Sequence, residues 1–272
     1  MNFLRIATLI VSSCILFASC SSNENKKNIS DSAVSPVSGL QKTNTDSGTL
    51  EVKSIPGLKE SNATLTSAAG KITQKGKFYN NEKAGAWIKY DENGKAISAL
   101  HFSKGKPIHE LDPEDFNVRT INDKGFGATF QVPEKWIDGG SPDHSRLISF
   151  YKKLKDPAAE LDPNFNFRHE KLQPGDSLKN IADTQMEILH ENVGRVDMVE
   201  ESYFVIDSSN AIRRYGMFSD ESGSVGFLNA IIVSGNDVWV LSCEASNAKA
   251  GDFLSYQGVF QSILESFKRA KN

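Results

Sequence analysis

Seven strand-like runs constrain the fold of residues 115–270 more than any other feature of this sequence. The last three connections between them are short, and Gly235-Asn236-Asp237 separates the last two runs, so we expect antiparallel pairing. The runs are Gly127–Val132, Arg146–Tyr151, Asn164–Lys171, Val196–Asp207, Ala211–Phe218, Val225–Ser234 and Val238–Ala245.

Two segments with helical periodicity interrupt or follow these runs. Asp176 or Ser177 can cap the first helix, which we expect at Leu178–Asn192. In the second, Asp252–Arg269, large apolar residues recur at the spacing of one helix face. They are Phe253, Tyr256, Phe260, Ile263, Leu264 and Phe267. We therefore expect an α+β domain, with one antiparallel sheet covered on one face by two helices.

This layout resembles the Mog1/PsbP/DcrB-like family. The resemblance rests on the opening FGATFQVPEKW at Phe126–Trp136, a middle helix, the hairpin Val225–Ala245 and the ending FQSILESFKRA at Phe260–Ala270. It implies a PsbP-like fold for residues 115–270. Because most members of the family are not known as enzymes, it also implies a binding or assembly role.

Residues 71–110 predict a small meander of three short strands. Asn93-Gly94 lies between the runs Ala86–Tyr90 and Ala96–Phe102, and this dipeptide suits a two-residue type I′ hairpin turn. A second turn, Asn80–Gly85, precedes Trp87.

The residues of this segment resemble a MORN-like repeat of YwqK-family proteins. The matching residues are G-x-W-x-x-Y-D-E-N-G-K at Gly85–Lys95, followed by F-S-K-G-K at Phe102–Lys106. The family is often described as antitoxin, so the resemblance implies an alternative function as an immunity or antitoxin-like inhibitor. A single repeat buries little apolar surface, so we expect it to pack on a neighbouring segment.

Residues 1–19 have the pattern of a cleavable export signal. Arg5 gives the positive start, and Ile6–Phe17 is an apolar stretch too short to span a bilayer. Ala18, Ser19 and Cys20 resemble the lipobox of bacterial lipoproteins, which implies acylation of Cys20, palmitate included. A second local match ends at Cys14.

The lipobox resemblance also implies a location. We expect a cell-envelope protein that reaches the membrane through its lipid anchor. Ser21 is not the aspartate that retains lipoproteins at the inner membrane, so the outer membrane is favoured.

Residues 20–70 predict a lipidated flexible tether, because residues 21–70 contain no aromatic residue and are rich in Ser, Thr, Asn, Lys and Gly. A short strand near Leu50–Ile55 is the alternative within it. Cys243 is the one cysteine left after cleavage and lipidation, so the fold must rest on its own core, without an internal disulfide. With 31 basic and 34 acidic residues, the chain has no charge excess that favours nucleic acid.

We find no catalytic constellation, and we expect no enzyme activity, no cofactor and no metal. Asp143-His144-Ser145 contains the residue types of a hydrolase triad, but adjacent residues rarely achieve its geometry. Gly70–Lys77 departs from a P-loop, with Phe78 where Ser or Thr must bind Mg²⁺. Asp112, Glu114 and Asp115 could hold Ca²⁺, although a solvated turn is the simpler interpretation.

Charged pairs on neighbouring predicted strands are the remaining candidates for a binding site. Glu200-Glu201 and Arg213-Arg214 form either a cross-strand ion pair or a binding patch. Together these features predict a non-enzymatic envelope lipoprotein that binds a protein partner or a ligand.

Overall fold

The computed structural model describes residues 39–123, 125–140, 147–154, 161–220, 223–246 and 252–270. These residues lie in one unit, Val34–Asn272. The export segment, both lipobox cysteines and the triplet Asp143–Ser145 lie outside the described residues. Within those described, no helix is both long and apolar enough to cross a membrane.

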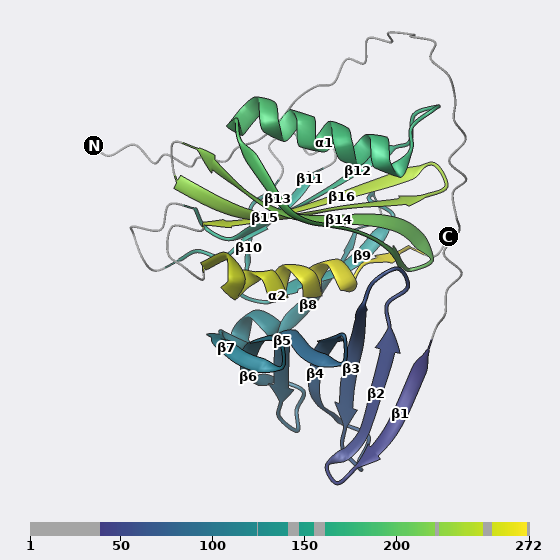
Figure 1. Ribbon diagram of the computed structural model, residues 1–272, viewed down its shortest axis with the longest axis vertical. Helices are drawn as coiled ribbons and strands as arrows, with labels where there is room; N and C mark the ends of the chain where they lie inside the picture. Colours follow the sequence, from purple (N-terminus) through teal and green to yellow (C-terminus); the bar gives the residue numbers. More distant parts are fainter. Residues whose placement is uncertain are drawn as a thin grey trace. The chain divides into compact units, whose positions relative to one another are not determined.

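The first part of the fold is a seven-stranded antiparallel sheet, which we call the meander sheet. Its strands follow one another in sequence order (Figure 1). They are β1 (Leu40–Thr45), β2 (Gly48–Ser54), β3 (Glu60–Thr66), β4 (Ile72–Tyr79), β5 (Glu82–Tyr90), β6 (Ala96–Ser103) and β7 (Lys106–Leu111).

A second seven-stranded antiparallel sheet, the central sheet, has the order β10-β11-β12-β16-β15-β14-β13. Its strands are β10 (Ile137–Asp138), β11 (Leu147–Tyr151), β12 (Asn164–Lys171), β13 (Val196–Ile206), β14 (Ser209–Asp220), β15 (Gly223–Ser234) and β16 (Asp237–Ser246). All seven predicted strand runs are confirmed, six of them in this sheet and the first in the small sheet below.

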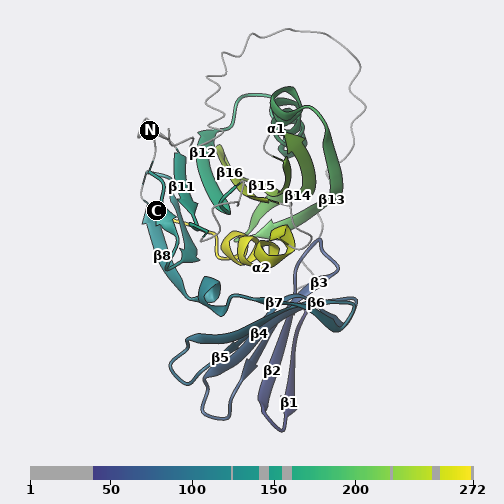
Figure 2. The same cartoon turned by 90° about the vertical axis from the view of Figure 1, so that its left-hand side faces the viewer.

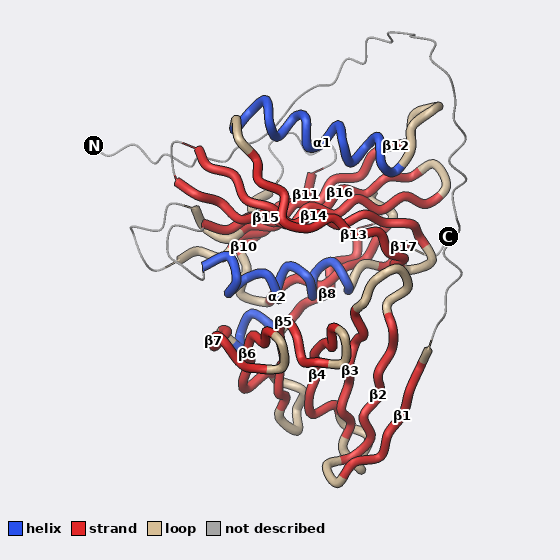
Figure 3. The backbone as a smooth tube through the Cα atoms, viewed as in Figure 1, coloured by secondary structure: helices blue, strands red, loops and turns tan. Residues whose placement is uncertain are grey.

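A three-stranded small sheet and two α-helices complete the described fold. The small sheet has the order β17-β9-β8, with β8 at Val118–Asp123, β9 at Ala128–Pro133 and β17 at Lys268–Arg269. A 3₁₀ turn, η1 (Pro113–Phe116), connects the meander sheet to β8. Helix α1 (Leu178–Val193) and helix α2 (Asp252–Glu265) lie on opposite faces of the central sheet (Figures 1 and 3).

The expected fold class, one sheet covered on one face by two helices, is wrong. The described chain is mostly strand, with three sheets, and its two α-helices pack on different faces of the central sheet. The face that carries α2 is also covered by the small sheet, because Phe130 of β9 packs on Phe165 and Phe167 of β12. Apolar side chains on both faces of β14–β16 require such covering on both sides.

The expected disordered tether is also wrong for its described part. Residues 40–66 form β1, β2 and β3, of which β2 includes most of the short strand considered near Leu50–Ile55. Backbone pairing orders this segment without aromatic residues, and Ala63 on β3 is 2% exposed. Ile55 and Leu58, in the β2–β3 turn, pack against the main core. The meander therefore has seven strands, where three were expected.

The Asn93-Gly94 hairpin is confirmed, but its turn is not type I′. Gly94 has a positive φ of 80° and Asn93 does not. The Asp91 side chain accepts bonds from the backbone N–H groups of Asn93 and Lys95, which supports a longer turn. Two-residue turns with positive φ at both positions instead join β4 to β5 at Asn80-Asn81, β6 to β7 at Lys104-Gly105 and β13 to β14 at Asp207-Ser208.

The first helix agrees with its prediction, and the second is shorter. Ser177 caps α1, its hydroxyl accepting a bond from the backbone N–H of Asn180 at 3.1 Å. Helix α2 ends at Glu265 rather than Arg269, because Lys268-Arg269 pairs with β9 as strand β17.

Helix α2 is packed on two sides. Phe260, Ile263 and Leu264 are at most 2% exposed and belong to the main core. Its other side crosses β5 of the meander sheet at Gly258. A Cβ on Gly258 would lie 2.5 Å from the Cβ of Ala86, so only glycine permits this approach. The contact shows that the meander packs on a neighbouring element, as expected for a repeat with little core of its own.

Strand β13 is an edge strand of the central sheet, and its free edge is covered near Tyr203–Val205. The β2–β3 turn lies against it, and the backbone N–H of Val205 donates to the carbonyl of Pro56 at 3.2 Å. Closer to the start of the strand, the register shifts between Met198 and Glu200, which is a β-bulge. Val199, inside the bulge, is 70% exposed.

Candidate functional site

The four charged residues that the sequence singled out form two separate ion pairs. Arg213 donates to Glu200 at 3.0 Å, and Arg214 donates to Glu201 at 2.8 Å. Because successive residues of a strand point to opposite faces, the two pairs lie on different sides of the central sheet. Both cross-strand ion pairs are therefore present. They form no single patch, and both arginines are buried at 3% exposure rather than on the surface.

Arg214 fixes helix α1 to the central sheet. Its guanidinium donates to Asp183 of α1 at 2.6 Å and to the backbone carbonyl of Ala182. The hydrogen bonds to Glu201 and Asp183 compensate for the burial of the charge. This side of the sheet therefore uses its arginine for structure.

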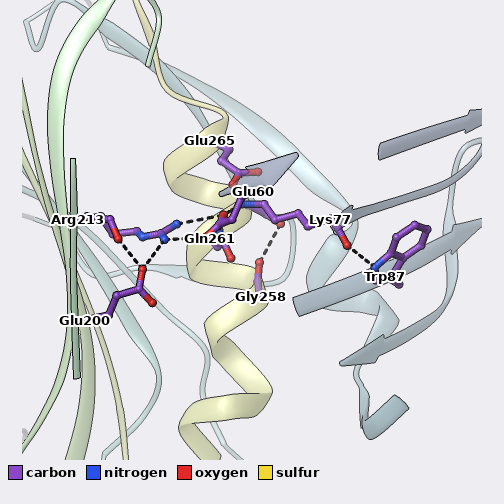
Figure 4. A network of polar contacts seen from close by, with 10 residues as sticks. Glu60, Lys77, Trp87, Glu200, Arg213, Gly258, Gln261 and Glu265 are labelled. Atoms are coloured by element: carbon purple, nitrogen blue, oxygen red, sulfur yellow. Dashed lines mark hydrogen bonds and ion pairs between the residues drawn. The ribbon is translucent and has the colours of Figure 1, made fainter. Parts of the chain in front are cut away.

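Arg213 lies at the junction between the central sheet, helix α2 and the meander sheet (Figure 4). Its Nη2 atom donates to Glu60 of β3 at 2.8 Å. Glu60 also accepts bonds from Lys77 of β4 at 2.9 Å and from the amide of Gln261 on α2 at 3.1 Å. One carboxylate thus connects three elements that are far apart in the sequence.

Lys77 extends this network along α2. Its ammonium group is paired with Glu60 and with Glu265 of α2, and its side chain is 10% exposed. The backbone carbonyl of Lys77 accepts a bond from the indole N–H of Trp87 at 2.9 Å (Figure 4). Trp87 covers Gly76, where a Cβ would lie 2.2 Å from the indole ring. Trp87 therefore holds the strand that presents Lys77 to the junction.

A cavity of about 140 Å³ lies at this junction. A buried water needs only about 10–15 Å³ of the same kind of space, so the cavity has room for several waters or a small ligand. Its charged wall residues are two acids and two bases, so their formal charges cancel. The wall consists of Glu60, Lys77, Tyr79, Ala84, Gly85, His101, Glu200, Arg213, Tyr215, Gln257, Gly258 and Gln261.

Two buried polar atoms of the cavity wall have no hydrogen-bond partner. They are Nε of Arg213 and Nδ1 of His101, on side chains from the central sheet and from β6. Buried polar atoms are normally bonded, because leaving one unpaired costs about 1–3 kcal/mol. Both atoms belong to residues that line the cavity, so a molecule bound there is the candidate partner of both.

Electrostatics at the junction favours charged Glu60 and neutral His101. Burial alone would raise the pKa of Glu60, but Lys77 and Arg213 outweigh it and hold that pKa at about 2. Burial, together with the neighbouring His109, lowers the pKa of His101. Burial raises the pKa of Tyr215, so this side chain keeps its hydroxyl proton. At neutral pH the wall thus offers a guanidinium, a carboxylate, an imidazole and a phenol.

Sequence reasoning found Arg213 and Glu200 but missed their partners Glu60, Lys77 and Gln261. Glu60 lay in the expected tether, and Lys77 was the last residue of the rejected P-loop-like stretch, which is part of strand β4. Gln261 stood on the predicted second helix between core positions. Contacts between residues 153 to 201 positions apart leave no local signal in the sequence.

The three acidic residues Asp112, Glu114 and Asp115 form ion pairs with lysines. Lys152 pairs with Asp115 at 2.7 Å and with Asp112 at 2.9 Å, and Lys135 pairs with Glu114. Asp112 also caps the 3₁₀ turn. The solvated turn is therefore not the right description for Asp115, which is 5% exposed. Among the described residues, no group of three or more His, Cys, Asp or Glu side chains is arranged to hold a metal ion.

Comparisons with known proteins give matches among solved structures only. No family model and no curated protein matches the chain. The solution structure of cyanobacterial PsbP from Synechocystis is similar over 56% of this chain and 92% of its own, with 10% identity and a TM-score of 0.45. LpqN of Mycobacterium tuberculosis, described as involved in cell envelope biogenesis, is similar over 52% and 82%, with 18% identity and a TM-score of 0.38. These TM-scores are low, so the likenesses carry no argument about function.

Proposed function

We propose that this protein is a non-enzymatic envelope lipoprotein that binds a small polar ligand at the junction cavity. The observation that carries the proposal is the pair of buried, unpartnered atoms, Arg213 Nε and His101 Nδ1, in the wall of one cavity. Two such atoms in one wall indicate a ligand or water that completes their bonding.

The wall also defines the chemistry of the ligand. Arg213 Nε is always a donor, whereas Nδ1 of neutral His101 accepts, because the other ring nitrogen donates to the backbone of Leu254. Glu60 is committed to Lys77, Arg213 and Gln261, and the charged residues of the wall, two acids and two bases, balance one another. A small neutral molecule with both donor and acceptor groups fits this wall better than an ion, which would bring an unbalanced charge into a buried site.

The ligand can be tested by native mass spectrometry of protein purified from membranes under mild conditions. We expect a bound mass that is lost on denaturation. Ala84→Leu, which adds bulk to the cavity wall, should remove that mass, while Ser103→Leu at an exposed position of the same sheet should keep it. Wild-type protein that carries nothing but water would refute ligand binding. Melting curves of both variants check that they are folded.

The envelope location rests on the lipobox and is tested separately. Metabolic labelling with a fatty-acid probe should mark the wild-type protein and Cys14→Ala, and leave Cys20→Ala unlabelled. Label that persists on Cys20→Ala and disappears from Cys14→Ala would move the acylation site to Cys14. A protein partner in the envelope and the antitoxin-like alternative remain separate proposals, which capture of the lipidated protein with cross-linking would distinguish.

A further inference from the structure

A row of polar side chains runs across six strands of the central sheet, on the face that carries α1. Directly paired residues of antiparallel strands point to the same face, so the register defines the row. Arg214 marks which face this is, because it bonds to Ala182 and Asp183 of α1. In order from β13 to β11, the row is Glu201, Arg214, Asn229, Ser242, Asn166 and Ser149.

This row divides the apolar packing beneath α1 into two clusters. One cluster contains Ile212, Ile231 and Val240, and the other contains Phe218 and Phe227. The opposite face of the same strands shows no such division, because Phe165, Phe167 and Leu241 belong to one continuous core on the α2 face. A polar row through a helix-covered sheet gives up apolar burial, so structure alone is a weak reason for it.

Only the first part of the row has a structural role under α1. Helix α1 packs mainly on β13, β14 and β15 and reaches β12 through the bond between Gln185 and Arg168, and Figure 2 shows β11 and β12 to the side of it. Beyond the arginine, the row contains only amides and hydroxyls, and all four side chains are half-buried. These four residues, which we call the amide row, are Asn229, Ser242, Asn166 and Ser149.

The amide row keeps unused hydrogen-bonding capacity. Asn229 donates to Ser242 at 3.1 Å, and Asn166 donates to Asn164 at 2.9 Å. Each amide oxygen of this row can still accept, and within the described residues the Ser149 hydroxyl has no hydrogen bond. Alternating donors and acceptors at strand spacing suit a ligand that carries several hydroxyl or amide groups.

The groups around the amide row disfavour an anionic partner, because the carboxylate of Glu244, directly opposite Asn164, lies on the same face as Ser242. Arg168, on β12 two residues from Asn166, is paired with Glu170 at 2.6 Å and bonded to Gln185 of α1 at 3.0 Å. Tyr151 is paired with Asn164 and so lies on the same face, where its half-buried ring offers an apolar surface. A sugar ring has hydroxyls at its edge and C–H groups on its face. The hydroxyls can bond to the neutral polar groups of the row, and the C–H groups can pack on the aromatic ring.

We propose that the amide row binds a neutral glycan, independently of the junction cavity. The glycan's hydroxyl or acetamido groups bond to Asn229, Ser242, Asn166 and Ser149, and one sugar ring lies against Tyr151. Asn166 lies between Ser242 and Ser149 in the row and makes the central contact.

Titration of the ¹⁵N-labelled protein with two neutral trisaccharides tests this proposal. Chitotriose carries acetamido groups and maltotriose carries hydroxyls only, so the pair also identifies which groups are recognised. We expect shifts confined to β11, β12, β15 and β16. Asn166→Leu should weaken binding about tenfold, the usual effect of losing one or two hydrogen bonds.

Two matched variants separate this surface from general effects. Asn122→Leu makes the same change on an exposed strand position of the small sheet and should bind like wild type. Ala84→Leu alters the junction cavity and should also leave glycan binding unchanged, so loss of the cavity ligand and loss of the glycan are distinguishable. No shift with either trisaccharide, or equal binding by Asn166→Leu and wild type, would overturn the proposal.

Discussion

Replacing Glu60 with glutamine tests whether the junction network stabilises the fold as the geometry indicates. Glu60 accepts from Arg213 at 2.8 Å, from Lys77 at 2.9 Å and from Gln261 at 3.1 Å. Its side chain is 16% exposed, so water screens these contacts little. Glu60→Gln keeps the size of the side chain and removes its charge, which leaves two buried cations without their shared anion.

The magnitude follows from the pKa of Glu60, which falls from 4.5 to about 2 on folding, because Lys77 and Arg213 outweigh the cost of burial. A difference of about 2.5 pKa units, at about 1.36 kcal/mol each, corresponds to about 3 kcal/mol. Removing one partner of a buried ion pair costs about 3–5 kcal/mol in other proteins, which agrees in size.

The direction of the pKa change on folding determines how the stability difference depends on pH. A carboxyl whose pKa is lowered by folding stabilises the protein fully above its unfolded pKa and loses that contribution as pH falls through the folded value. The wild-type advantage over Glu60→Gln should therefore be largest above about pH 5 and decline towards pH 2. Because both proteins share every other titrating group, their difference isolates Glu60.

Urea unfolding at a series of pH values, followed by tryptophan fluorescence, measures this difference. Glu51→Gln is the matched control, because Glu51 forms an exposed ion pair with Lys42 on the same sheet and should change stability by less than about 1 kcal/mol. A Glu60→Gln difference that stays constant from neutral pH to about pH 3 would refute the reasoning. It would mean that packing, rather than charge, accounts for the loss.

Three further changes test other parts of the fold. Phe260→Ala removes a fully buried ring beside Trp136 and should cost about 3–5 kcal/mol in chemical unfolding, whereas a docking role for that helix face would leave stability unchanged. Gly258→Ala would normally favour a helix, but its Cβ would meet Ala86, so thermal unfolding should show a loss of about 1–3 kcal/mol rather than a gain. Ser177→Ala removes the cap of α1 and should cost about 1 kcal/mol by the same measurement, and an unchanged midpoint would contradict the capping assignment.

Local patterns in the sequence predicted the elements of the C-terminal part well. The seven strand runs, the Ser177 cap and the buried face of the second helix all follow from periodicity and cap chemistry over a few residues. Which face each helix covers does not follow from such patterns. Both faces of the central strands are apolar in places, and the same stripe on α1 would suit either face.

The N-terminal sheet was the largest miss. Residues 40–66 resemble a linker in composition, yet seven consecutive strands satisfy one another's backbone groups without a core on every strand. The sequence also failed to predict most of the candidate site, for a related reason. Arg213 and Glu200 are neighbours through local strand pairing, whereas Glu60 joins them only because the meander sheet and α2 pack side by side.

The partly covered edge of β13 has a consequence for how copies of this chain behave at high concentration. An unpaired strand edge can recruit a strand from another molecule, and the turn at Pro56 occupies this one near Val205. The bulge at Val199 interrupts the hydrogen-bonding pattern closer to the start of the strand. Changes that loosen the meander, Glu60→Gln among them, should therefore promote aggregation before they unfold the central sheet. Light scattering below the melting temperature would detect this.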